Sequence, residues 1–80
     1  MVALLGEMAV FVKVVETGSF SETARQLGAT PSAISRSVAR LEKALGTRLL
    51  QRTTRKLRLS ESGHEVHRRC VDIVSAAQAV

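Results

Sequence analysis

Basic side chains with hydroxyl groups between them are the residues of this chain whose types and spacing point to chemistry with phosphate. Between residues 36 and 58, eight Lys and Arg stand against the single acidic residue Glu42, a net charge of +7. The remaining 57 residues carry four basic and six acidic side chains, a net charge of −2. Because each Lys or Arg placed on a phosphate releases condensed counterions, this asymmetry favours nucleic acid as the partner. A membrane surface, or a charged face that serves only solubility, is the alternative that charge alone leaves open.

Residues for nucleophilic or metal chemistry are sparse. His64 and His67 lie three residues apart and Cys70 three further on, a spacing that could share a metal. We expect solvated histidines and a small buried cysteine instead. The sequence offers no serine with a recognisable histidine and carboxylate partner, and no glycine-rich phosphate loop. It therefore predicts a protein that is not an enzyme and that uses no cofactor and no metal.

The length of the chain predicts one small domain. It has 80 residues, of which 45% are apolar, with one Pro and five Gly. The single Cys excludes an internal disulfide, and residues 1–6 lack the basic region and cleavage pattern of a secretory signal. No apolar run approaches the ~18 residues of a membrane helix. We expect a cytoplasmic protein that makes no membrane contact.

The first third of the chain has the spacing of two helices. Apolar residues recur four, three and four positions apart at Leu4, Met8, Phe11 and Val15. Gly18 suits a left-handed helix end. Ser19, with Glu22 three residues on, fits a capping box in which each side chain satisfies a backbone amide. The second helix is expected to bury a face made of Phe20, Thr23, Ala24 and Leu27.

A third helix is predicted to begin at Pro31 and to end at Leu45. Gly28 accepts the positive φ that ends the second helix, Thr30 suits an N-cap, and Pro31 suits the first helical position. The buried face of the third helix is Ile34, Val38, Leu41 and Leu45. Two helices joined by a short turn of this composition describe a helix-turn-helix.

The face of the third helix that points away from the core carries short residues and arginine. At about 100° per residue, Ser32, Arg36, Ala39 and Lys43 lie roughly 140° to 200° from Ile34. A helix in a DNA major groove needs short residues for close approach and an Arg or polar group for base edges. The predicted base contacts are Ser32, Ala33, Ser35 and Arg36, and the predicted backbone contacts are Thr30, Pro31, Arg40 and Lys43. For Arg36, a solvated side chain or a phosphate contact is the alternative.

A hairpin over residues 50–59 follows, which we call the wing. Leu57 and Leu59 alternate with Lys56 and Arg58, which predicts a strand with one wet face that pairs with residues 50–52. The tip residues predicted to contact phosphate or a narrow minor groove are Arg52, Thr53, Thr54 and Arg55. A charged edge that prevents sheets from pairing between molecules is the alternative.

Ser60 is expected to cap a fourth helix over residues 60–80. Its apolar residues recur four, three, four and three positions apart, over two heptads, and they favour a partner. These residues, Val66, Cys70, Ile73, Ala77 and Val80, are here called the dimer seam.

Several short runs of this chain stand in a characteristic order and spacing. They are Phe11-Val12, Gly18-Ser19-Phe20-Ser21, Ala24, Leu27-Gly28, residues 30–36, Leu41-Glu42, Leu45-Gly46, Leu49-Leu50, Arg52-Thr53 and residues 59–63. Together they resemble the N-terminal winged helix-turn-helix of LysR-type transcriptional regulators. The resemblance implies a mainly α fold, with a three-helix core and a two-stranded wing over residues 1–59 and a linker helix over residues 60–80 that pairs antiparallel in a homodimer.

The same resemblance implies sequence-specific binding of double-stranded DNA by a bacterial transcription regulator. The recognition helix, residues 31–45, would enter the major groove, and the wing would contact the backbone or minor groove. A small-molecule coinducer would act only through a C-terminal domain that is absent from this chain. Thr23, Thr30 and Leu50 depart from the family's usual alanine, glutamine and phenylalanine, and Thr30 is expected to act mainly as a cap.

Two other classes of function remain as alternatives. A protein-interaction module that has lost DNA binding is disfavoured by the charge of residues 36–58. RNA binding is disfavoured because Phe11 and Phe20 are the only aromatic residues and both are needed inside, whereas single-stranded bases stack on exposed aromatic rings.

Overall fold

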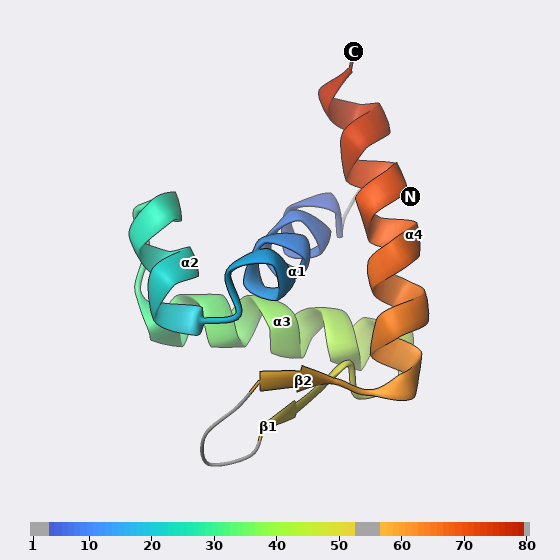
Figure 1. The fold of residues 1–80 in the computed structure, drawn as a ribbon, viewed down its shortest axis with the longest axis horizontal. Helices are drawn as coiled ribbons and strands as arrows, with labels where there is room; N and C mark the ends of the chain where they lie inside the picture. Colours follow the sequence, from blue (N-terminus) through green and yellow to red (C-terminus); the bar gives the residue numbers. More distant parts are fainter. Residues whose placement is uncertain (1–3, 53–56, 80) are drawn as a thin grey trace.

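The computed structural model describes residues 4–52 and 57–79. Its elements are α1 (Leu5–Thr17), α2 (Phe20–Leu27), α3 (Pro31–Leu45), β1 (Leu50–Arg52), β2 (Leu57–Leu59) and α4 (Glu61–Gln78). α1 packs on α2, α3 and α4, and the hairpin lies at the end of α3 next to the start of α4 (Figure 1). A mainly α fold with a two-stranded antiparallel wing, as expected from the sequence, is confirmed.

The turn between α2 and α3 has the predicted local structure. Gly28, with φ of 66°, ends α2 in the left-handed conformation, and its N–H donates to the carbonyl of Ala24. Thr30 Oγ1 accepts from the backbone N–H of Ala33 at 3.1 Å, so α3 begins at Pro31 with its first turn capped. The predicted start and end of α3 are both confirmed.

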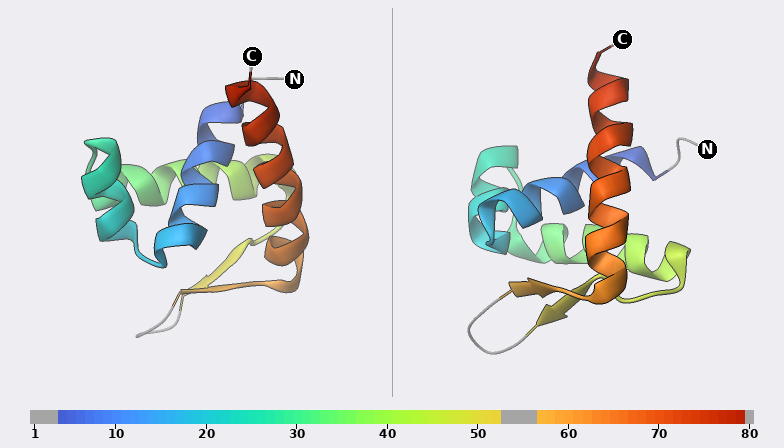
Figure 2. Two further views of the ribbon diagram at one scale, coloured as in Figure 1. Left: turned by 45° about the horizontal axis from the view of Figure 1, so that its top comes forward. Right: turned by 45° about the vertical axis from the view of Figure 1, so that its right-hand side comes forward.

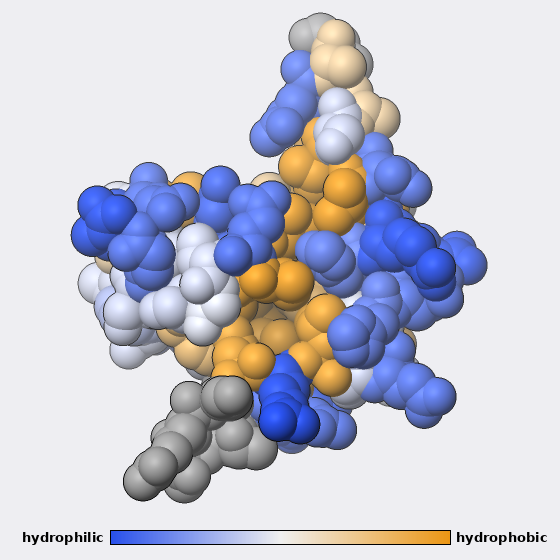
Figure 3. Space-filling model, viewed as in Figure 1, coloured by the Kyte–Doolittle hydropathy of each residue, from blue (hydrophilic) through white to orange (hydrophobic). Residues whose placement is uncertain are grey.

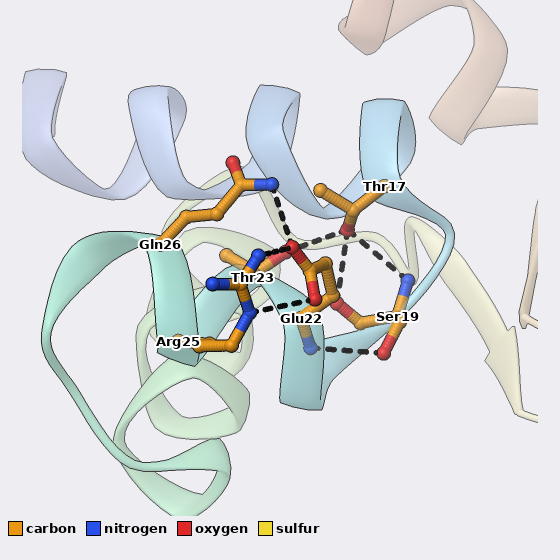
Figure 4. Close-up of polar contacts among 6 residues, drawn as sticks. All are labelled: Thr17, Ser19, Glu22, Thr23, Arg25 and Gln26. Atoms are coloured by element: carbon orange, nitrogen blue, oxygen red, sulfur yellow. Dashed lines mark hydrogen bonds and ion pairs between the residues drawn. The ribbon is translucent and has the colours of Figure 1, made fainter.

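The junction of α1 and α2 confirms only half of the predicted capping box. Ser19 Oγ accepts from the N–H of Glu22 at 3.0 Å, as expected. The Glu22 carboxylate does not complete the box, because it bonds two side chains further along α2. The N–H of Ser19 donates instead to Thr17 Oγ1 at 3.2 Å, and that oxygen lies 2.8 Å from the hydroxyl of the fully buried Thr23 (Figure 4). A threonine pair therefore joins α1 to α2.

The core gathers apolar residues from α1, α2, α3, β1 and α4. Its buried members are Phe11, Val12, Val14, Ala24, Ile34, Val38, Leu41, Leu49, Leu50 and Cys70. Two residues expected inside are not buried, since Leu27 is 47% exposed and Leu45 is 42% exposed. Each lies in the last turn of its helix, directly before the glycine that ends it, where the neighbouring elements cover less of its surface.

The wing has the predicted strand pairing and alternation. Leu50 pairs with Leu59, Gln51 with Arg58, and residue 52 with Leu57. Leu57 and Leu59 are half-buried while Arg58 is exposed, so one face of the hairpin packs inward and the other carries charge. The predicted tip residues 53–55 lie outside the described part of the chain.

A compact set of polar contacts joins α3, β1 and α4. Glu42 Oε2 accepts from the backbone N–H of Leu49 at 2.8 Å and from that of Leu50 at 3.2 Å. The Leu49 carbonyl in turn accepts from the N–H of Ser60 at 2.9 Å. A Cβ atom at Gly63 would lie 2.1 Å from the same carbonyl oxygen. We call Glu42, Leu49, Leu50, Ser60 and Gly63 the α3–β1–α4 junction.

α4 begins as predicted and then packs along α1. Ser60 Oγ accepts from the N–H of Gly63 at 2.9 Å and so caps the helix. α4 contacts α1, and the two helices cross in the right-hand view of Figure 2, whereas the hairpin extends away from the first turn of α4. No helix in residues 4–52 and 57–79 is long and apolar enough to cross a membrane.

Candidate nucleic-acid interface

The face of α3 opposite the core is open to solvent. Ser32, Arg36, Ala39 and Lys43 are all exposed, which confirms the rotation expected from helical geometry. Ala33 and Ser35, on the two flanks of this face, are half-buried. The first two turns of α3 therefore present small side chains and one arginine, an arrangement that permits close approach to another surface.

Thr30 and Pro31 precede this face and are both exposed. The Thr30 hydroxyl oxygen accepts the capping hydrogen bond, which leaves its own hydrogen free to donate outward. Pro31 has no N–H to satisfy at the first helical position. The N-terminus of α3 thus points its remaining polar groups toward solvent next to Ser32.

Cations outside the strongly basic part of the chain are paired with acids. Lys13 pairs with Glu16 at 3.3 Å, Arg25 pairs with Glu22, and Glu65 pairs with Arg68 at 2.7 Å and with Arg69 at 3.0 Å. These pairs lie on α1, α2 and α4, within single helices. Their cations are partly neutralised by neighbours three or four residues away.

Two of these acidic side chains have pKa values below the ordinary value of a glutamate. Hydrogen bonds from Arg25, and then from Gln26, lower the pKa of the Glu22 carboxyl to about 2 (Figure 4). The hydrogen bond from Arg69, followed by the charge of Arg68, lowers the pKa of the Glu65 carboxyl. Both carboxylates therefore stay ionised at neutral pH and remain available to their arginines.

Four described cations between residues 36 and 58 lack such partners. Among the residues whose side chains the structure describes, four make no ion pair, and we call them the unpaired cations: Arg36, Lys43, Arg48 and Arg58. All four are exposed. Arg36 and Lys43 share the open face of α3, Arg48 follows α3, and Arg58 lies on β2. Among the described side chains, the unpaired positive charge therefore lies on α3, on the segment that follows it and on β2.

Arg40, predicted as a backbone contact, is already paired within the molecule. Its Nε lies 3.2 Å from Glu7 Oε2 on α1, and its Nη2 donates to Ser37 Oγ at 3.1 Å. The Arg40 side chain is 58% exposed and that of Glu7 is 20% exposed. Sequence patterns gave no signal for this pair, because its partners are 33 residues apart.

Residues of the predicted dimer seam lie in two different environments, one inside the chain and one exposed to solvent. Val66 packs against the core and Cys70 is only 2% exposed, because this side of α4 faces α1 of the same chain. Burial raises the pKa of the Cys70 thiol. Ile73 is 45% exposed and Ala77 is also exposed, while Val80 lies outside the described residues.

A groove with a mixed apolar and polar lining lies among α1, α4 and the last residue of α2. Val12, Leu27, Val71 and Val74 are among the residues that line it. Figure 3 shows hydrophobic side chains gathered at the centre of this view, with hydrophilic side chains around them. Val74, which the seam omitted, therefore contributes to the packing of α4 against α1.

The histidines of α4 differ from the expectation in one case. His64 is exposed, as expected. His67 is half-buried, its ring centroid lies 6.1 Å from that of Phe11 in an edge-to-face contact, and its Nε2 atom is buried without a hydrogen-bond partner. In the described part of the chain, no three His, Cys, Asp or Glu residues cluster as a metal site would require.

The fold and the exposed basic face define a winged helix-turn-helix protein. Residues 5–64 match the family model described as bacterial regulatory helix-turn-helix protein, lysR family. The chain belongs to this family, and the resemblance found in the sequence is confirmed.

Curated relatives of the chain are transcriptional regulators rather than enzymes. The probable HTH-type transcriptional regulator LtrA of Klebsiella pneumoniae is 55% identical over 75 residues, which cover 94% of this chain and 24% of that protein. The HTH-type transcriptional regulator CrgA of Neisseria meningitidis is 52% identical over 73 residues, which cover 91% of this chain and 24% of that protein. The chain thus spans about a quarter of the length of these relatives.

Solved structures of similar fold include DNA complexes of two different DNA-binding domains. The BenM DNA-binding domain in complex with benA site 1 DNA superposes with a TM-score of 0.88 and 31% identity, covering 94% of this chain and 84% of that one. The CbnR DNA-binding domain in complex with DNA gives a TM-score of 0.87 and 28% identity, covering 94% of this chain and 86% of that one.

Proposed function

We propose that this chain is a DNA-binding domain that recognises double-stranded DNA by sequence, with α3 in the major groove and the wing on the adjacent backbone or minor groove. The observation that carries the proposal is the position of the unpaired cations on the open face of α3 and on the hairpin. Exposed cations without acidic partners gain most from phosphate, because counterion release drives association. The DNA complexes of the similar BenM and CbnR domains support it.

Base contacts are proposed for the N-terminal half of α3. Arg36 is exposed and unpaired, so its guanidinium is free to make the bidentate contact that arginine forms with guanine. Ser32 and Ser35 offer hydroxyls to base edges, and Ala33 permits close approach or contacts a thymine methyl group. Ser32, Ala33, Ser35 and Arg36 together form the proposed base-contacting set.

Backbone contacts are proposed on both sides of this set. Thr30 and Pro31 lie at the N-terminus of α3, and Lys43 lies on the same face two turns beyond Arg36. On the hairpin, Arg58 is exposed next to Gln51. The tip residues Arg52, Thr53, Thr54 and Arg55 remain proposed wing contacts on the strength of the sequence.

Dimerisation through α4 is a further part of the proposal. Val71 and Ile73 are large apolar residues exposed on α4, and a second copy would cover them. Paired domains would fix the spacing of two DNA half-sites. In a longer protein, a small-molecule coinducer would act through a domain beyond residue 80. A cytoplasmic location follows from the proposal, because bacterial DNA lies in the cytoplasm.

Selection of bound duplexes from a random pool is the first test. We expect a preferred sequence, and two half-sites if the domain dimerises. Titration of a preferred and a scrambled duplex at several salt concentrations then measures the electrostatic part of binding. The logarithm of the association constant should fall linearly with the logarithm of the salt concentration, with a slope of about −0.9 per phosphate contact.

Single substitutions separate the two proposed roles. Arg36→Ala should lower the preference for the selected sequence roughly 5- to 150-fold, the value of one bidentate base contact. Arg58→Ala should weaken binding to both duplexes equally and make the salt slope shallower by about 1. Arg69→Ala is the matched control, since it removes an arginine that is paired with Glu65 on α4.

Two results contradict the proposal. Absence of any shift of random duplex at micromolar protein and low salt would favour a protein-interaction module. If the ratio of the affinities for the selected and the scrambled duplex is the same in Arg36→Ala as in the wild type, Arg36 has no base-contacting role.

A further inference from the structure

Arg40 differs from the unpaired cations although it lies beside them. Four residues separate it from Arg36, so the two side chains project about 40° apart around α3. Lys43 lies one turn further along the same side. Arg40 is 58% exposed, yet its Nε is held 3.2 Å from the carboxylate of Glu7. A cation at the edge of the proposed DNA surface is therefore neutralised by an acid of another helix.

Glu7 differs in its position from the acids of the other ion pairs. It belongs to the first turn of α1, where the helix dipole favours a negative charge. Its side chain is only 20% exposed, so its carboxylate has less freedom than those of the surface pairs. All other ion pairs between the described residues join neighbours within one helix, whereas Glu7 reaches α3 from α1.

We propose that Glu7 limits the affinity of the domain for DNA by competing with phosphate for Arg40. The inference rests on the proposed function. It gives Arg40 two competing partners, Glu7 and a DNA phosphate. In the free protein, Arg40 pairs with Glu7. In the complex, phosphate must displace Glu7 or leave Arg40 out of the interface. Either way Arg40 adds less to binding than an unpaired arginine would, and Glu7 lowers the affinity for every sequence alike.

Substitution Glu7→Gln tests the proposal with little change of shape. Glutamine retains an oxygen that accepts from Arg40 Nε, but it removes the charge. We expect roughly 3- to 10-fold tighter binding to selected and scrambled duplexes at low salt, and a salt slope steeper by about 0.9. The gain should shrink as the salt concentration rises. Thermal unfolding should show a melting temperature close to that of the wild type, because glutamine keeps the hydrogen bond and an ion pair with an exposed arginine stabilises little.

Two controls isolate the role of Arg40. Glu16→Gln removes the same charge from α1, but its partner is Lys13, one turn away on the same helix. We expect a smaller gain in affinity from this variant and an unchanged slope. In an Arg40→Ala background, Glu7→Gln should have no more effect than Glu16→Gln. These measurements form a double-mutant cycle for the pair.

Each other outcome overturns the inference. If Glu7→Gln binds DNA with the same affinity and salt slope as Glu16→Gln, Glu7 does not compete with phosphate for Arg40. If the gain persists in the Arg40→Ala background, it reflects net charge alone. Weaker binding by Glu7→Gln would mean that the pair supports the bound form. If the wild type binds no duplex, the proposed function is refuted. The proposed competition between Glu7 and phosphate is then refuted as well.

Discussion

The turn between α2 and α3 and the α3–β1–α4 junction both orient the proposed DNA surface, but different interactions hold them. In the turn, every contact joins residues at most five positions apart, as in the capping of Ala33 by Thr30. In the junction, Glu42 reaches residues seven and eight positions away. The Leu49 carbonyl accepts from Ser60, eleven positions away, and touches Gly63.

This difference predicts how the two regions respond to substitution. A local turn tolerates changes that preserve its backbone conformation, because water can replace many of its exposed contacts. The junction is partly buried and three elements converge on it, so a change in one element must displace another. We therefore expect the larger losses of stability at the junction.

Gly63→Ala is expected to have the largest effect. The new Cβ would lie 2.1 Å from the Leu49 carbonyl oxygen, so the backbone of α4 or β1 must move. We expect a loss of about 3 kcal/mol or more of unfolding free energy, and a melting temperature lower by roughly 12 °C or more. Thermal unfolding followed by circular dichroism measures both.

Gly6→Ala is the matched control for Gly63→Ala. Gly6 also lies in the first turn of a helix, but a Cβ there would meet no atom within 4 Å. Helix propensity alone then predicts a gain of up to about 1 kcal/mol. Similar effects of the two alanines would mean that the contact of Gly63 with Leu49 does not constrain the junction.

Glu42→Ala is expected to have the next largest effect. It leaves the N–H groups of Leu49 and Leu50 without their charged acceptor, at a cost of about 2 kcal/mol. Hydrogen exchange at these two amides should become faster while exchange in α1 changes less. Glu16→Ala, which removes an exposed carboxylate from α1, should change stability by less than about 0.5 kcal/mol. Unchanged exchange at Leu49 and Leu50 would contradict the bridging role of Glu42.

Gly28→Ala probes the turn and should cost less. The φ of 66° is unfavourable for alanine by about 1 kcal/mol, but a Cβ at this position would meet no atom within 4 Å. Gly28→Asn should cost less still, because asparagine tolerates the left-handed conformation. Denaturant unfolding of both variants measures the difference. If Gly28→Ala lost as much unfolding free energy as Gly63→Ala, the turn would be as sensitive to substitution as the α3–β1–α4 junction.

The same distinction explains which features the sequence could predict. The caps at Ser19, Thr30 and Ser60 and the left-handed Gly28 depend on neighbours within four or five residues, so residue type and spacing suffice. The open face of α3 follows from helical periodicity once its buried face is recognised. For this reason the positions of the proposed base contacts were predictable, and the family resemblance added their expected role.

Features that depend on the arrangement of elements were not predictable. The pairing of Glu7 with Arg40 and the contacts of Glu42 have no local pattern. The periodicity of Leu27 and Leu45 predicted burial, but neighbouring elements do not cover the last turns of α2 and α3. On α4, periodicity could not indicate that Cys70 faces α1 of its own chain.

The smallest expected effect is that of Glu22. Its contacts, like those of the turn, are local, because both of its partners lie within α2. Its pKa in the folded protein is about 2, below its ordinary value of 4.5, because Arg25 and Gln26 donate to it. A carboxyl whose pKa is lowered by folding stabilises the folded state above its ordinary pKa. That contribution is lost as the pH falls from about 4.5 through about 2. Glu22→Gln should therefore be less stable than the wild type at pH 6, and the difference should become small near pH 2 and vanish below it.

Unfolding free energies of the two proteins across this pH range measure the effect, and salt should reduce it because the group is exposed. Glu42→Gln at pH 6 provides the contrast, since it removes the carboxylate that accepts from two backbone N–H groups in the α3–β1–α4 junction. If the stability gap of Glu22→Gln were constant with pH, its bonds to Arg25 and Gln26 would not persist in solution. If that gap exceeded the gap of Glu42→Gln at pH 6, exposed contacts within α2 would matter more than the partly buried junction, and the comparison between the two regions would fail.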